Sequence, residues 1–151
     1  MLSGEVIMID NNTFALERGM VGAALCHVDE VITLRESGVT PEDITLPSAR
    51  FILNVLNDLE SQGLLETAQP ITSLVLREAD RREFKLTHQD LSEFSESAPL
   101  PGPPLQRMIK AWHKARDSWK LVQELEQLIV AARAGHISRE DLGLAFGEYH
   151  E

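Results

Sequence analysis

The chain has 151 residues, 43% of them hydrophobic, and a net charge of −10, which excludes a disordered chain and disfavours nucleic-acid binding unless a local basic patch overrides the charge. No apolar run reaches the roughly 20 residues of a membrane-spanning helix, and the first residues lack the basic segment of a secretory signal, so no membrane association is expected. The single cysteine, Cys26, excludes an intramolecular disulfide and suits the cytoplasm, where we expect the protein to reside.

The N-terminal part is predicted to be mainly one helix. Residues 2–9 are predicted as a short strand or an extended arm, followed by residues that commonly cap helices. Apolar positions then recur at helical spacing and predict a helix from Thr13 to Ser37, which Gly38 ends. Gly19 and Gly22 weaken its first half, and their small size would allow close packing against a neighbouring element.

The next segment predicts a short helix and then a longer amphipathic one. Thr40 and Pro41 are typical of a helix start, but Pro47 interrupts that helix soon afterwards. A new helix opens at Ser48 and ends at Gly63. Its apolar stripe, which we expect to face the core, comprises Phe51, Ile52, Val55, Leu56 and Leu59.

A β-hairpin is predicted after this helix. Residues 71–76 are partly β-branched, and residues 83–87 alternate between polar and apolar side chains. Residues 79–82 supply a charged turn between them. Thr87 and Asp90 then have the spacing of a capping box, which starts a short helix ending near Phe94.

A proline-rich segment, residues 96–104, separates the predicted N-terminal domain (residues 1–95) from a helical extension (residues 105–151). The extension reads as one long amphipathic helix ending at Gly135, followed by a short helix that begins at Ser138. The predicted fold class is therefore mainly α with a small β-hairpin.

Two stretches of this sequence resemble winged-helix proteins, and MarR-type regulators most closely. The first is Ser48–Leu65 (SARFILNVLNDLESQGLL), whose Leu-Glu-x-x-Gly-Leu ending is similar to the end of a recognition helix. The second is Asp80–Thr87 (DRREFKLT), which is similar to the MarR wing. The resemblance covers about a third of the chain and implies a winged-helix core, DNA binding and a homodimer formed through terminal helices. The helix between Pro41 and Pro47 is shorter than in typical members.

The resemblance implies a set of DNA-binding residues on the recognition helix and the wing. Arginine, asparagine and serine can contact base edges, and cations can contact phosphate. The candidate residues are Ser48, Arg50, Asn54, Asn57, Arg81, Arg82 and Lys85. A possible secondary basic stripe lies on the long C-terminal helix, where Arg107, Lys110 and Lys114 follow at spacings of three and four residues. That stripe is alternatively the solvated face of an amphipathic helix.

No catalytic, metal or cofactor motif is evident. The five histidines lack ligand spacing relative to each other and to Cys26, and no phosphate-binding glycine loop or nucleophile elbow occurs. We therefore expect no enzyme and no cofactor. Two functions stay open: a winged-helix DNA-binding regulator of transcription, and an acidic protein–protein interaction module, such as an adaptor, an inhibitor or a subunit of a larger assembly, that does not bind DNA.

Overall fold

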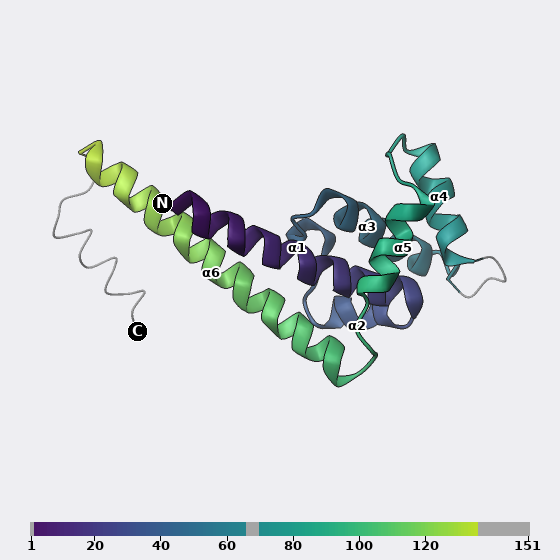
Figure 1. The fold of residues 1–151 in the computed structure, drawn as a ribbon. Coiled ribbons are helices and arrows are strands. Elements are labelled where there is room, and N and C mark those ends of the chain that lie inside the picture. Colours follow the sequence, from purple (N-terminus) through teal and green to yellow (C-terminus); the bar gives the residue numbers. More distant parts are fainter. Residues whose placement is uncertain (1, 66–69, 136–151) are drawn as a thin grey trace. The chain divides into compact units, whose positions relative to one another are not determined.

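All regular structure in the computed structural model is helical within the residues it describes, which are 2–65 and 70–135, with the backbone alone for residues 2–11. The helices are α1 (Leu2–Cys26), α2 (Glu30–Glu36), the 3-10 helix η1 (Pro41–Asp43), α3 (Pro47–Ser61), α4 (Ile71–Arg81), α5 (His88–Ser97) and α6 (Pro103–Arg133) (Figure 1). The expectation of a mainly α protein is confirmed. The predictions of a β-hairpin and of a winged-helix core are wrong, because both need β-strands and no strand occurs in the described ranges.

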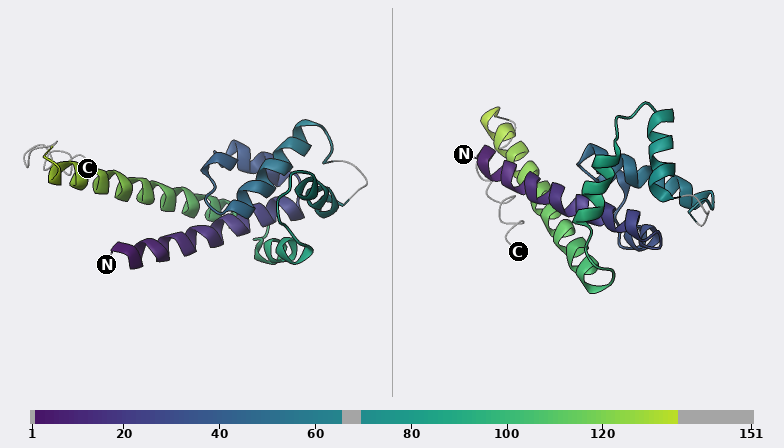
Figure 2. Two further views of the ribbon diagram at one scale, coloured as in Figure 1. Left: turned by 90° about the horizontal axis from the view of Figure 1, so that it is seen from above. Right: turned by 45° about the vertical axis from the view of Figure 1, so that its right-hand side comes forward.

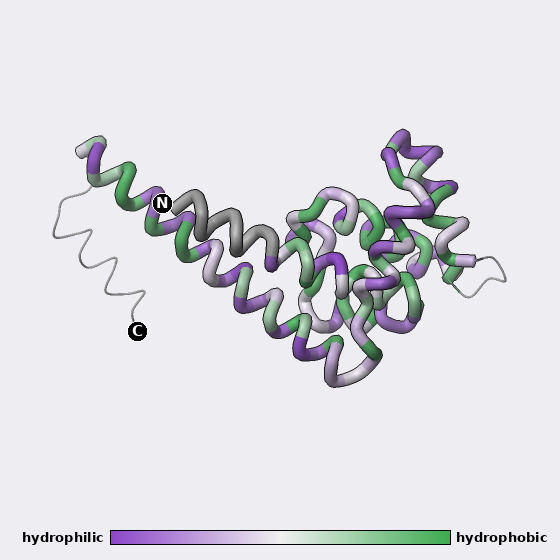
Figure 3. Tube along the Cα trace, viewed as in Figure 1, coloured by the Kyte–Doolittle hydropathy of each residue, from purple (hydrophilic) through white to green (hydrophobic). Residues whose placement is uncertain are grey.

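The chain divides into two compact units, residues 1–112 and 113–151, and the division falls inside α6 rather than in the proline-rich segment 96–104. The first ten residues of α6 belong to the first unit, where Leu105, Ile109 and Trp112 are buried. In Figure 3 hydrophobic and hydrophilic residues alternate along α6. No helix in the described part of the chain is both long enough and apolar enough to span a lipid bilayer.

The core of the first unit forms where α1 packs against α3 and α5. In the right-hand view of Figure 2 α5 crosses α1, and in the left-hand view it lies beside α1. Gly22 makes this crossing possible, since a Cβ atom on Gly22 would collide with the backbone carbonyl of Phe94 in α5. Gly19 similarly faces Met108 of α6. The prediction that these two glycines allow close packing is therefore confirmed.

The N-terminal elements differ from the prediction at both ends. Residues 2–9 are helical and belong to α1, not to a strand or an extended arm. The predicted single helix from Thr13 to Ser37 is interrupted after Cys26, and a turn leads into α2. This turn returns the chain to the core, where Val31 and Leu34 of α2 are fully buried.

The predicted hairpin is instead helix α4 followed by a loop. Its buried side chains, Leu74, Val75 and Ala79, have the spacing of one helical face. The helix ends at Arg81, and Glu83, just after the cap residue Arg82, has a positive φ of 57°. The amide of the following Phe84 donates to the carbonyl oxygen of Ala79 at 2.8 Å, as in a Schellman ending. The β-branched residues in 71–76 favour a strand, but the segment is helical because a helix buries these apolar side chains on one face.

Three local predictions are confirmed. Helix α3 buries Ile52, Val55, Leu56 and Leu59 of the predicted stripe, and it ends before Gly63, whose φ is 72°. Thr87 and Asp90 form a reciprocal capping box at the start of α5. The long C-terminal helix is also present as α6. The predicted short helix beginning at Ser138 lies outside the described residues.

Candidate functional site

Three of the predicted DNA-binding residues, Asn57, Arg81 and Arg82, are already engaged with other side chains of the protein. Arg82 donates to Asp58 at 2.9 Å and to Glu78 at 3.1 Å, while Arg81 contacts Glu78 at 2.6 Å. The pair of Arg82 with Asp58 joins the end of α4 to α3, while the pairs with Glu78 are local to α4. The two arginines predicted to lie in a wing therefore lie at a helix end, where carboxylates of the same chain partly neutralise them.

These ion pairs predict a pH effect on stability. The pKa of Glu78 lies below its ordinary value of 4.5, first because Arg81 donates hydrogen bonds to it, with further contributions from the charge of Arg81 and from Arg82; burial opposes the shift. A carboxyl whose pKa is lowered in the folded state adds stability above its unfolded-state pKa. That contribution is lost as the pH falls through the lower folded-state pKa.

Glu78→Gln is therefore expected to lower the free energy of unfolding at neutral pH, by less than about 1 kcal/mol because the pair is near the surface. The difference from the unmodified protein should shrink at about pH 3, where carboxyls are largely protonated. Urea unfolding at both pH values measures it. Glu93→Gln is the matched control, because Glu93 is exposed and forms no ion pair within the described residues. A Glu78→Gln difference that is constant with pH would contradict the assignment.

The candidate residues on α3 lie in different environments: one contacts α2, and others line a groove. Asn57 accepts a hydrogen bond from Arg35 of α2 at 3.1 Å, and Arg35 also contacts Glu60 at 2.7 Å. Ser48 is half-buried near the start of the helix. Arg50 and Asn54 are exposed and line a groove elsewhere on the helix. The structure thus brings Arg50 and Asn54 together in this groove, while Asp58, one helical turn after Asn54, pairs with Arg82.

This groove, which we call the α3 groove, is a candidate site in the first unit. Its volume is about 320 Å³, at the lower end of small-molecule pockets, and it is lined by Thr45, Pro47, Arg50, Phe51, Asn54 and Phe84. The rings of Phe51 and Phe84 stack with their centroids 4.1 Å apart and their planes 4° apart. Lys85, another predicted DNA-binding residue, follows Phe84 and is exposed. The groove therefore combines an aromatic wall with a cationic and an amide side chain.

A buried carboxylate that sequence reasoning missed supports one edge of this groove. Glu17 of α1 is fully buried and accepts hydrogen bonds from the amide and hydroxyl of Thr45, at 2.9–3.0 Å, and from the amide of Leu46 at 2.8 Å. The indole Nε1 of Trp112 donates to the other side of the carboxylate at 2.9 Å. Glu17 thereby joins α1, the start of α3 and the first turns of α6.

The geometry of Glu17 indicates a structural role. Leu46 is the N-cap residue of α3, and its side chain cannot accept a hydrogen bond. Glu17, 29 residues away, instead accepts from the amide of Leu46 itself, and an anion near a helix N-terminus is favourable. One sequence signal could have revealed this role, since Glu17 shares the helical face of Thr13, Met20 and Ala24, which are all buried. A carboxylate on an apolar face calls for an internal partner.

The predicted basic stripe consists of exposed side chains. Arg107 and Lys110 lie on the part of α6 in the first unit, and Lys114 lies on the part in the second. Within the described residues none of the three forms an ion pair. Their exposure fits both an anion-binding surface and a solvated helix face, so the stripe stays a prediction.

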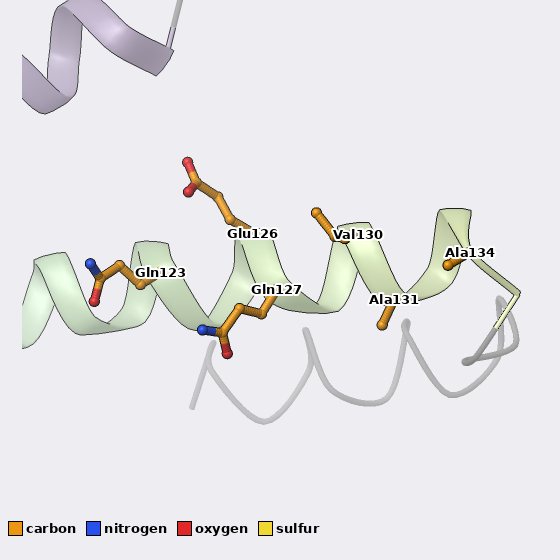
Figure 4. Close-up of a pocket in the computed structure, with 6 residues that line it drawn as sticks. All are labelled: Gln123, Glu126, Gln127, Val130, Ala131 and Ala134. Carbon is orange, nitrogen blue, oxygen red and sulfur yellow. The ribbon is translucent and has the colours of Figure 1, made fainter.

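A pocket in the second unit has no group of described side chains that point toward a common centre. Its described lining comes from α6 alone, from Gln123 to Ala134. Figure 4 shows Glu126 and Val130 pointing to one side of the helix and Gln127 and Ala131 to the other. Within the described residues there is also no cluster of three metal-ligating side chains.

Comparison with known proteins adds no identification. No protein-family model, curated protein or solved structure matches the chain.

Proposed function

We propose that the protein is an acidic, non-catalytic interaction module that binds another protein. The observation that carries this proposal is the neutralisation of Arg81 and Arg82 by Glu78 and Asp58. Phosphate contacts dominate the affinity of DNA-binding proteins and require available cations. A chain of net charge −10 whose Arg81 and Arg82 are paired with carboxylates is poorly suited to that task. The α3 groove, with its mixed aromatic and polar lining, is better suited to side chains of a protein partner.

The competing proposal is a DNA-binding regulator that uses Arg50, Lys85 and the basic stripe on α6. One measurement distinguishes the two proposals, because they predict different results for it. It is binding to a random-sequence DNA duplex at low salt, where non-specific electrostatic binding is strongest. We expect no mobility shift at protein concentrations of tens of micromolar. A shift that weakens steeply with added salt would favour DNA binding and would contradict our proposal.

A positive test complements this titration. The full chain should capture a stoichiometric protein from extracts of its source cells. The two purified proteins should then sediment together as one complex. Sedimentation of the chain alone also tests the homodimer predicted through the C-terminal helix, and a monomer at micromolar concentration would contradict it. We place the complex in the cytoplasm, because the single Cys26 suits a reducing compartment.

A further inference from the structure

We propose that the α3 groove binds a short acidic peptide segment in which a carboxylate lies beside an apolar side chain. This inference rests on the proposed function and names the chemistry of the partner. Among the described residues that line the groove, Arg50 is the one charged side chain, and the nearby carboxylate of Glu17 is buried behind Thr45, where it accepts hydrogen bonds from the protein. The exposed charge of the groove is therefore positive in a strongly acidic chain, and complementary charge favours an acidic partner.

Arg50 differs from the arginines described above in how it is held. Its Nε donates to the backbone carbonyl of Ile44 at 2.9 Å, which fixes the guanidinium at the rim. Within the described residues it forms no ion pair, whereas Arg35, Arg81 and Arg82 each contact a carboxylate. The terminal amino groups of Arg50 therefore remain free to donate to a carboxylate from outside. Because one nitrogen is already anchored, less conformational entropy is lost on binding.

The aromatic wall specifies the second element of the ligand. The stacked pair of Phe51 and Phe84 is half-buried, and each ring braces the other. A rigid apolar surface beside a charged group suits an aliphatic or aromatic side chain next to an acidic residue. Asn54 lies one helical turn after Arg50, and its exposed amide can donate to or accept from a peptide backbone.

The start of α3 also holds the groove in shape before any ligand arrives. Thr45 lines the groove, while its amide and hydroxyl donate to the buried Glu17. A peptide would therefore meet a site whose edge is already fixed, which reduces the ordering cost of binding.

The test uses the full chain and a fluorescein-labelled peptide, Ser-Glu-Phe-Glu-Glu-Leu-Ser, followed by fluorescence anisotropy. A second peptide has glutamine in place of each glutamate. We expect saturable binding of the acidic peptide only. Arg50→Gln should weaken it about tenfold, since a hydrogen bond between charged groups is lost. Arg77→Gln is the matched control, because Arg77 is exposed on α4 and has no ion pair within the described residues, and it should change the affinity less than twofold.

A second variant keeps the proposal testable if Arg50→Gln does not fold, which circular dichroism would reveal. Asn54→Ala removes an exposed groove side chain and should weaken the peptide about threefold. Absence of saturable binding up to about 1 mM, or equal losses from Arg50→Gln and Arg77→Gln, would overturn the proposal. If a partner complex forms and is insensitive to Arg50→Gln, the groove assignment fails while the proposed function stands. Binding of duplex DNA without any protein partner would instead remove the proposed function.

Discussion

Glu17→Ala is expected to lower the free energy of unfolding by about 3–5 kcal/mol. The carboxylate is fully buried, and its removal leaves the amides of Thr45 and Leu46 and the indole of Trp112 without their acceptor. A donor that loses its acceptor away from water costs about 1–3 kcal/mol, and the indole belongs to the fully buried Trp112, whereas the two amides are part-buried. Urea unfolding followed by tryptophan fluorescence measures the loss.

Two further variants test the reason for this effect. Glu17→Gln keeps the size of the side chain and one acceptor oxygen, so its loss should be smaller, about 2 kcal/mol. Glu36→Ala is the control, since Glu36 is exposed and forms no ion pair within the described residues, and it should change stability by less than about 0.5 kcal/mol. If Glu17→Ala unfolds at the same urea concentration as Glu36→Ala, the hydrogen bonds around Glu17 do not hold the fold together.

Gly22→Ala is expected to destabilise the first unit by about 2–4 kcal/mol, because overpacking against a rigid neighbour forces the backbone to move. The added methyl group would collide with the carbonyl of Phe94, and α1 and α5 would have to separate. Helix propensity acts in the opposite direction, since alanine is favoured over glycine inside a helix by about 0.5–1 kcal/mol. Thermal unfolding followed by circular dichroism measures the balance.

Gly19→Ala supplies the contrast within the same helix. The atoms that its methyl group would meet first are at the flexible end of Met108, which can move aside at low cost. The gain in helix propensity should then offset most of the crowding, and the change should stay within about 1 kcal/mol. If the two substitutions lowered the stability equally, the close approach of α5 to Gly22 would not be the cause of the destabilisation.

The parts of the fold that were predictable are those set by local sequence. The stripe along α3, the glycine after it and the capping box at Thr87 each depend on residues within one or two turns. The size of Gly22 also carried enough information to predict a close approach, although not its partner.

Helix α4 shows why the remaining structure was not predictable in the same way. Ile71, Leu74, Val75 and Ala79 fit a helical face, but the β-branched residues among them equally favour a short strand. The choice depends on burial against the rest of the core, which a local pattern does not contain. The error then carried over to the site, because Arg81 and Arg82 were assigned to a wing when they lie at the end of a helix.

The candidate site was predicted only in part for a similar reason. Arg50 and Asn54 were selected because they lie opposite the apolar stripe of α3, and both are exposed. Phe51 was assigned to the core, and its stacking on Phe84 could not be foreseen, since the two residues belong to different elements. Glu17 has the same chemistry as any surface glutamate, and only its position on a buried face distinguishes it.

The hydrogen bond between Glu17 and Trp112 also bears on how the chain folds. It joins residues 95 positions apart, so the third partner of the carboxylate is made last during synthesis. A nascent chain that lacks α6 can form its local helices quickly but leaves one side of Glu17 facing water instead of the indole. Because loop-closure entropy rises only slowly with length, the late arrival costs little at equilibrium. Its consequence is for synthesis: the carboxylate obtains its full set of partners only when the first turns of α6 are in place.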